Sequence, residues 1–138
     1  MLVRCISTLP NEEQAKRLLG SYWPGKQTFH VEIGQEYIVF AMSIINGESW
    51  VQIEEKGFEF LIPVPLCLFE IVNGKVPSSW EVCIKGVNIH LWPSSFYKDQ
   101  YYHDKLSDGD PEILENYREV KTQILKEGGV KKTRTDEL

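Results

Sequence analysis

Between residues 28 and 72 the chain is a series of short segments rich in valine, isoleucine and aromatic residues, separated by turn-forming pairs. Such segments favour strands, and glycine after asparagine or lysine marks a reversal of the chain. The predicted strands are Thr28–Ile33, Glu36–Ile45, Ser49–Glu54, Phe58–Ile62 and Leu66–Val72. Asn46-Gly47 is the clearest hairpin turn, because both residues tolerate the positive φ angles of a type I′ turn. The pattern predicts an antiparallel meander.

Side-chain alternation indicates that one face of this sheet is buried. In SWVQIEE, Trp50, Gln52 and Glu54 point to one side, while Val51 and Ile53 point to the other.

Two later features extend the sheet. Pro63-Val64-Pro65 is unsuited to a central strand, because proline lacks the N–H that the ladder needs, so it predicts an edge or a crossover. Trp80–Ile84 and Val87–Leu91 predict a further hairpin around Lys85-Gly86.

Two segments have the period of a helix. Residues 11–22 begin with Asn11 as a candidate N-cap, and Trp23-Pro24-Gly25 ends them. Asp110 and Pro111 suit the cap and first position of a second helix, which Gly128-Gly129 stops. Its apolar stripe comprises Ile113, Leu114, Tyr117, Val120, Ile124 and Leu125.

These elements predict an α+β fold with an antiparallel sheet of about five to seven strands, a short N-terminal helix and a C-terminal helix packed on the sheet. We expect residues 1–129 to form one domain. Residues 130–138, VKKTRTDEL, are expected to form a flexible tail because they offer little apolar surface to offset the entropy of ordering.

The charge of the chain limits its partners. Residues 1–129 carry 12 Lys and Arg against 18 Asp and Glu. An acidic body repels phosphate backbones, since nucleic-acid affinity depends on neutralising phosphates with basic side chains. We expect a basic protein partner and no nucleic acid.

Cysteine usage and hydropathy indicate the compartment. Cys5, Cys67 and Cys83 are odd in number and widely spaced, which favours reduced thiols over disulfides or a zinc site. The N-terminus lacks the apolar run of a signal peptide, and no apolar segment approaches the roughly 20 residues that span a bilayer. We expect a cytoplasmic protein without membrane contact.

The stretch DKLSDGDPEILE, residues 104–115, resembles a calcium loop at Asp104, Asp108, Gly109 and Glu115. Leu106 occupies a position that should supply an oxygen, and Pro111 also departs from the template. A loop followed by a capped helix explains more of these residues. We therefore expect no metal and no other cofactor.

No catalytic motif occurs in the chain, neither H-E-x-x-H, G-x-S-x-G, a P-loop nor a glycine-rich dinucleotide turn. His103 beside Asp104 is expected to be a surface histidine whose pKa nearby acids raise. An enzyme or ligand site that combines His103 with Asp104, Asp108 or Glu112 remains an alternative.

Aromatic residues lie among acids in two regions, a mixture suited to docking a basic protein surface. Stacking on nucleobases is disfavoured because basic residues are not interleaved with these rings. The candidate partner-binding residues are Trp50, Glu54, Glu59, Tyr101, Tyr102, Asp104, Asp108 and Glu112.

Two blocks carry a resemblance to a family: FEFLIPVPLCLFEIVNGKVPSSW, residues 58–80, and FYKDQYYHDKLSDGDPEILENYREVK, residues 96–121. Together they resemble a poorly characterised group of small bacterial proteins with a proline-bearing strand, a Leu-Phe-Glu segment and an Asp-Gly entrance to a helix. Val64 and Asn73 depart from the usual pattern. The resemblance implies an immunity or accessory protein of a bacterial toxin system.

Two hypotheses of function follow. In the first, a non-enzymatic immunity protein binds and neutralises a basic toxin encoded nearby, as the acidic body and aromatic residues favour. In the second, the chain is a small enzyme or ligand-binding module with a site lined by histidine and aspartate.

Overall fold

The computed structural model describes residues 1–19 and 29–128. It has an α+β fold with two antiparallel sheets, which confirms the predicted fold class. The strands are β1 (Leu2–Cys5), β2 (Glu36–Ile38), β3 (Ala41–Ile45), β4 (Glu48–Glu54), β5 (Leu61–Pro65), β6 (Phe69–Asn73), β7 (Trp80–Lys85) and β8 (Asn88–Pro93). The described helices are α1 (Glu12–Leu19), α2 (Tyr102–Ser107) and α3 (Pro111–Glu127), with short 3-10 helices η2 (Leu66–Leu68) and η3 (Ser94–Lys98).

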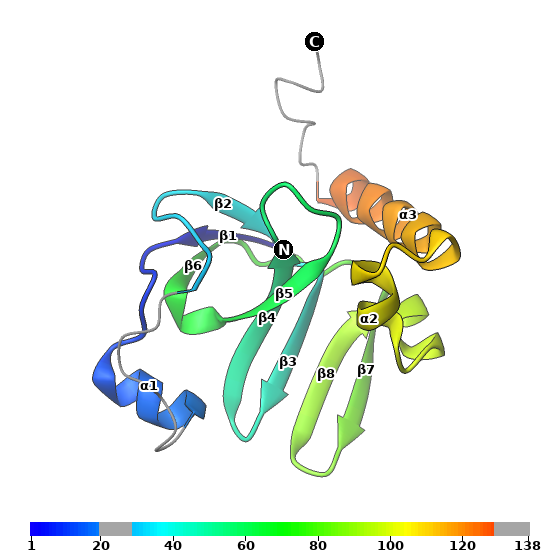
Figure 1. Cartoon of the computed structure of the whole chain (residues 1–138). Helices are drawn as coiled ribbons and strands as arrows, with labels where there is room; N and C mark the ends of the chain where they lie inside the picture. The colour runs from blue at the N-terminus through cyan, green and yellow to red at the C-terminus, as the bar shows by residue number, and fades with distance from the viewer. Residues whose placement is uncertain (20–28, 129–138) are drawn as a thin grey trace.

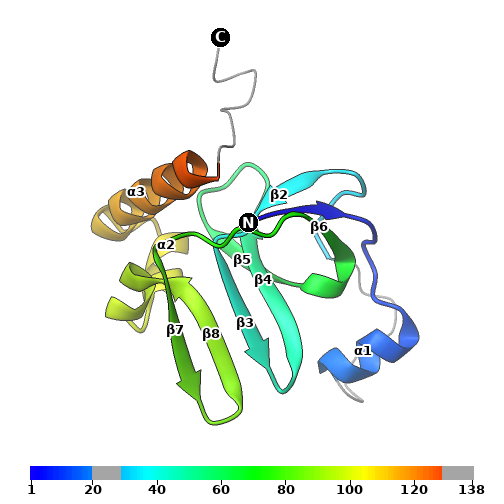
Figure 2. The ribbon, with the colours of Figure 1, turned by 180° about the vertical axis from the view of Figure 1, so that it is seen from behind.

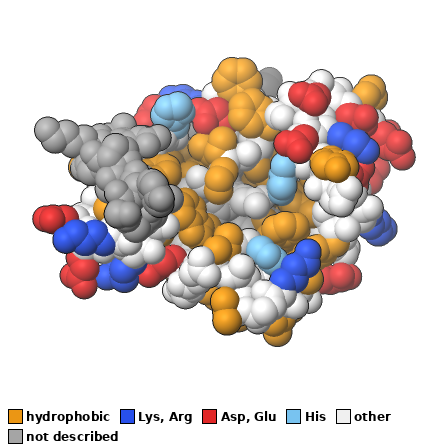
Figure 3. Space-filling view, turned by 60° about the horizontal axis from the view of Figure 1, so that its bottom comes forward, with side chains coloured by type: hydrophobic (Ala, Val, Ile, Leu, Met, Phe, Trp, Pro, Cys, Tyr) orange, Lys and Arg blue, Asp and Glu red, His pale blue; other side chains and the backbone are white. Residues whose placement is uncertain are grey.

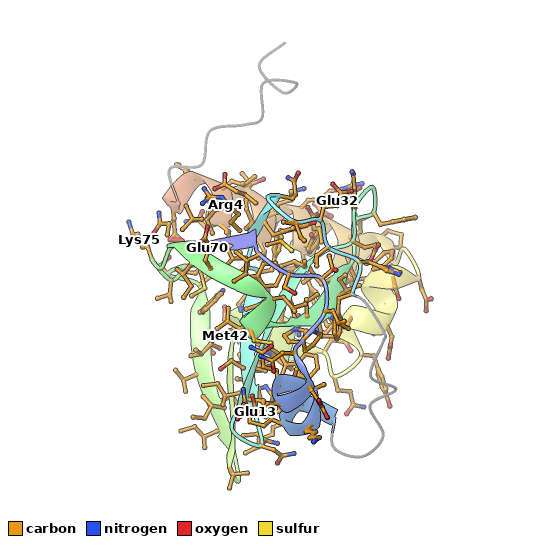
Figure 4. All side chains as sticks on the ribbon, turned by 90° about the vertical axis from the view of Figure 1, so that its left-hand side faces the viewer. Arg4, Glu13, Glu32, Met42, Glu70 and Lys75 are labelled. Atoms are coloured by element: carbon orange, nitrogen blue, oxygen red, sulfur yellow. The ribbon has the colours of Figure 1, made fainter. Side chains whose placement is uncertain are left out.

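The five-stranded sheet is the centre of the molecule and has the order β5-β4-β3-β8-β7. The smaller sheet, β2-β1-β6, lies against one of its faces, and α2 and α3 lie against the other (Figures 1 and 2). Arg4 of β1 joins the outer strands of the small sheet, because its guanidinium binds Glu36 at 3.1 Å and Glu70 at 2.8 Å. Figure 4 labels Arg4 and Glu70.

Two hydrophobic cores result from these layers. The core between the sheets contains Val3 and Cys5 from β1 with Val51 and Ile53 from β4. The core between the large sheet and the helices is a second set of buried residues: Phe40, Ala41, Phe96, Tyr102, Leu106, Tyr117 and Ile124. The predicted alternation of β4 is therefore confirmed, since Val51 and Ile53 share the inter-sheet core.

Local signals in the sequence place several elements correctly. Asn46 and Gly47 have φ angles of 51° and 82° and form the predicted turn between β3 and β4.

Asn11 caps α1, because its side chain accepts the N–H of Gln14 at 2.8 Å. Asp110 caps α3 by accepting the N–H groups of Glu112 and Ile113. The proline-bearing strand β5 lies at an edge, as predicted.

Other strand predictions are corrected. Residues 29–33 form no strand, because a turn in which the N–H of Gln35 donates to the carbonyl of Glu32 reverses the chain. The single strand predicted for residues 36–45 is two strands, β2 and β3, in different sheets. The break falls at Val39 and Phe40, two consecutive residues that enter the two different cores.

Three further differences concern the chain's extended segments. The strand predicted for Phe58–Ile62 begins later, at Leu61, because residues 55–58 form a turn. The strand predicted from Leu66 begins at Phe69, since η2 follows Pro65. The sequence prediction did not include β1, although it is the central strand of the small sheet.

Some predictions lie outside the described residues: the turn at residues 23–25 and the tail at residues 130–138. Among the helices that the structure describes, none is long and apolar enough to cross a membrane.

Candidate functional site

The predicted partner-binding residues fall into two groups. Trp50 and Glu54 lie on β4, and Glu59 lies in the connection from β4 to β5. The other group lies around α2 and the first turn of α3: Tyr101, Tyr102, Asp104, Asp108 and Glu112.

Glu54 and Glu59 attach α3 to the sheet. Glu54 accepts a hydrogen bond from the Tyr117 hydroxyl and binds the Lys121 ammonium at 3.0 Å. Glu59 receives two hydrogen bonds from the guanidinium of Arg118, at 2.7 and 2.8 Å. The hydrogen bonds from Arg118 lower the pKa of the Glu59 carboxyl. Both carboxylates are thus engaged within the chain, and a partner would compete with α3 for them.

The two neighbouring tyrosines have different environments. Tyr101 is 55% exposed, whereas Tyr102 is only 2% exposed. The Tyr102 ring stacks on Phe96 at a centroid distance of 4.4 Å, and its hydroxyl donates to Asn116 at 2.7 Å. Burial raises the pKa of Tyr102. In this fold α2 directs the Tyr102 side chain into the core, so the side chain is not at the surface of the described chain, and its predicted contact with a partner stays a prediction.

The segment predicted as a loop before α3 contains a short helix. Tyr102 and Leu106, one helical turn apart, are the buried residues of α2, and they turn Asp104 and Asp108 toward solvent. Asp110 then caps α3, so the helix-entrance interpretation of this stretch is confirmed. Within residues 1–19 and 29–128, no group of three or more His, Cys, Asp or Glu is placed to hold a metal ion.

Exposed acids continue from α2 along α3 and form a surface that we name the acidic ridge: Asp104, Asp108, Glu112, Glu115 and Glu119. No ion pair links any of these five carboxylates to another described residue. An open depression of about 740 Å³ lies beside the ridge, and Pro111 and Leu114 contribute apolar atoms to its lining. Arg118, which is paired with Glu59, also lines this depression, and Lys105 lies near Glu112, so the margin of the ridge is both apolar and basic.

His103 is not the surface histidine that the sequence predicts. Both ring nitrogens are buried, and neither has a hydrogen-bond partner in the described structure. The ring packs edge-on against Trp92, Phe96 and Tyr102. Burial lowers the pKa of His103, and the nearby Asp104 charge opposes this effect without overcoming it. The expected increase in pKa is therefore wrong, because desolvation outweighs the neighbouring carboxylate.

We predict that His103 makes the fold less stable as the pH falls from about 7.5 to about 5.5, around the ordinary histidine pKa. The unfolded chain protonates His103 at a pH where the folded chain does not, so protons favour unfolding in this range. Urea denaturation at several pH values should show a smaller loss of unfolding free energy for His103→Phe than for the wild type. Equal losses in the two proteins would contradict this explanation.

His90 is a second histidine that should contribute to the pH dependence measured in that experiment. Burial and the Lys85 charge lower its pKa as well, so part of the pH dependence should persist in His103→Phe. Adding His90→Phe to that variant should reduce the dependence further.

A polar network that the sequence did not reveal crosses the exposed part of the large sheet. Ser43 Oγ lies 2.8 Å from His90 Nδ1 and accepts the indole N–H of Trp92 at 3.0 Å. The Tyr97 hydroxyl accepts the backbone N–H of Trp92 in β8 at 3.2 Å and donates to the Glu81 carbonyl in β7 at 2.7 Å, so it bridges these two strands. No local sequence motif predicts this network, because residues 43 and 90 are brought together only by the register between β3 and β8.

The hydrogen bonds of this network connect β3, β8 and β7. Ser43 is buried, and its hydroxyl is engaged on two sides by His90 and Trp92. A serine nucleophile needs room for the reacting carbon and donors for an oxyanion, and this hydroxyl instead lies against an indole. Trp50 is half-buried and stands opposite Ser43 across β3 and β4, so it belongs to this face.

Figure 3 shows this side of the molecule from below, where the β3–β4 and β7–β8 hairpins end. Apolar side chains gather in the centre of the view, and most charged side chains lie toward its left and right margins. The arrangement resembles the apolar centre and polar rim of protein interfaces.

Comparison with known proteins adds no family to these observations. No family model matches the chain, and neither a curated protein nor a solved structure matches it. The resemblance to small bacterial proteins of toxin systems therefore stays a prediction.

Proposed function

We propose that this protein is a non-enzymatic immunity protein that binds and neutralises a basic bacterial toxin encoded by a neighbouring gene. The contact surface in this proposal is the acidic ridge, with Tyr101 beside it. The observation that carries the proposal is the set of five exposed carboxylates without an ion pair to another described residue. In the proposal the complex forms in the cytoplasm.

The two kinds of residue at this surface have different roles in binding. Carboxylates that face a basic surface raise the association rate, and this effect weakens as salt screens the charges. An aromatic side chain that becomes buried in the complex mainly slows dissociation. Tyr101, at 55% exposure, is the aromatic residue available for this role at the ridge.

The enzyme hypothesis gains no support from the predicted residues. The ring nitrogens of His103 form no hydrogen bond with Asp104, Asp108 or Glu112 in the described part of the chain. Acid–base catalysis requires such groups within hydrogen-bond reach of one another or of a substrate proton.

The test is a binding experiment with the purified product of the adjacent toxin gene. Asp104→Lys with Asp108→Lys should lower the association rate constant by about tenfold or more at low salt, because the favourable field is reversed. The same pair of changes should flatten the dependence of that rate on salt concentration. Stopped-flow fluorescence measures both quantities.

Glu12→Lys with Glu13→Lys is the matched control. These two acids are exposed on α1, away from the ridge, and the change in net charge is identical. The control should leave the association rate within about twofold of the wild type if local charge placement determines steering. Equal slowing by both variants would show that net charge alone matters and would exclude the ridge. No binding to the toxin would overturn the proposal for that pair.

A further inference from the structure

Strand β7 is an open edge of the large sheet. It is the last strand in the order β5-β4-β3-β8-β7, and no described strand pairs with its outer side (Figures 1 and 2). The opposite edge, β5, contains Pro63 and Pro65, which lack an N–H, whereas β7 contains no proline. An edge strand with free backbone groups is a template for pairing with another strand.

The geometry of the β7–β8 hairpin identifies the backbone groups that face outward. Lys85 and Asn88 flank the two-residue turn, and such a closing pair exchanges hydrogen bonds. Because the direction of these groups alternates along a strand, Cys83 also points its N–H and C=O toward β8. The corresponding groups of Val82 and Ile84 then face the open edge.

The side chains beside those groups are apolar and exposed. Val82 is 63% exposed and Ile84 is 66% exposed, on the same face of the sheet. Val87, in the turn that follows, is 77% exposed. Pairing with another strand would cover these side chains and the outward backbone groups together.

The sequence of β7 is complementary to itself in one antiparallel register. With a two-fold axis at Cys83, Val82 lies opposite Ile84 of the second copy, and Glu81 lies opposite Lys85 of the second copy. A two-fold axis at Val82 sets Glu81 against Cys83, and one at Ile84 sets Lys85 against Cys83. Only the register centred on Cys83 pairs opposite charges directly across the strands, where such pairs are stabilising.

We propose that this protein forms a symmetric dimer through β7, which joins the two five-stranded sheets into one continuous sheet. The occupant of the open edge is thus a second copy of the chain, chosen by the charge complementarity of Glu81 and Lys85. In this register Val82 and Ile84 are hydrogen-bonded partners, while the two copies of Cys83 form a non-hydrogen-bonded pair with Cα atoms about 4.5 Å apart. The acidic ridge lies on other elements, so this inference does not depend on the proposed function.

The first test is the molar mass of the reduced protein as a function of concentration, by analytical ultracentrifugation. The mass should rise from 16.0 kDa toward twice that value. Ile84→Pro should abolish this rise, because it removes an outward N–H that β8 does not use. Ile84→Thr keeps the N–H and the branched shape, so it is the matched control and should still dimerise.

Charge reversal tests the register. Glu81→Lys or Lys85→Glu alone places like charges opposite one another twice in the dimer and should raise its dissociation constant by about tenfold. The double variant restores opposite charges and should return the constant to within about threefold of the wild type. A monomer at every concentration, even one whose edge binds an extended segment of another protein, overturns the proposal. Single reversals without effect overturn it as well.

Oxidation gives an independent test of the same register. Diamide takes two electrons and two protons from a pair of thiols, and Cα atoms about 4.5 Å apart allow the resulting disulfide. A covalent dimer should form in the wild type and in Cys67→Ala, and should be lost in Cys83→Ala. A covalent dimer that survives Cys83→Ala would show that another surface pairs and would overturn the proposal.

Discussion

Tyr117→Ala is expected to lower the free energy of unfolding by about 3–5 kcal/mol, the range for removing a buried aromatic ring. Tyr117 is fully buried, and its ring lies 5.5 Å from that of Phe40. Burial and the Glu54 carboxylate raise the pKa of Tyr117, so its hydroxyl stays protonated and donates to Glu54. The substitution therefore removes core packing and one of the contacts that attach α3.

Urea denaturation followed by circular dichroism measures this loss. Tyr117→Phe keeps the ring and removes only the hydroxyl, so its expected cost is about 1.5–3 kcal/mol, typical of a hydrogen bond to a charged group. Tyr101→Ala removes an exposed tyrosine and should change stability by less than about 0.5 kcal/mol. A loss below about 1 kcal/mol for Tyr117→Ala would contradict the described packing of α3 on the sheet.

The sequence predicted those elements whose chemistry is local. The Asn46-Gly47 turn and the caps at Asn11 and Asp110 depend on residues within four positions of each other. Turn and cap preferences act at this range, so they do not depend on the rest of the fold. The α+β class followed from the order of these local elements.

Contacts between distant residues could not be predicted from one sequence. Glu54 and Tyr117 are 63 positions apart, and Ser43 and His90 are 47 positions apart. Both contacts depend on strand register and helix placement. A register shift of one residue would turn the side chains of a strand to the opposite face of the sheet and remove the contacts. The same limit applies to the candidate site, where packing of α3 determines that Glu59 is paired with Arg118.

Burial of Tyr102 and His103 illustrates a second limit. The segment is rich in acids and tyrosines, and its composition indicates a surface loop. Tyr102 and Leu106, four residues apart, both pack in the core and place this segment against it as α2. A helix of six residues has too few positions for its period to stand out in the sequence.

Phe40→Ala is expected to lower the free energy of unfolding by about 3–5 kcal/mol as well. Phe40 is 1% exposed and lies where the chain passes from the small sheet to the large sheet. Its ring contacts Tyr117, and its carbonyl accepts the indole N–H of Trp80 at 2.9 Å. The substitution leaves a cavity beneath α3 while the backbone contacts can persist.

A double-mutant cycle tests whether Phe40 and Tyr117 act as one unit. Their rings touch, so the loss for Phe40→Ala with Tyr117→Ala should fall short of the sum of the single losses by about 0.5–1.5 kcal/mol. Leucine replaces alanine at both positions if the double variant does not fold.

The control cycle pairs Tyr117→Ala with Val39→Ala. Val39 is adjacent to Phe40 in the chain but belongs to the core between the two sheets. Its effect should add to that of Tyr117→Ala within about 0.5 kcal/mol, because residues without shared contacts behave independently. Coupling in the Val39 cycle as large as in the Phe40 cycle would contradict the separation of the two cores by the large sheet. Additivity in both cycles would instead show that the rings of Phe40 and Tyr117 make no specific contact.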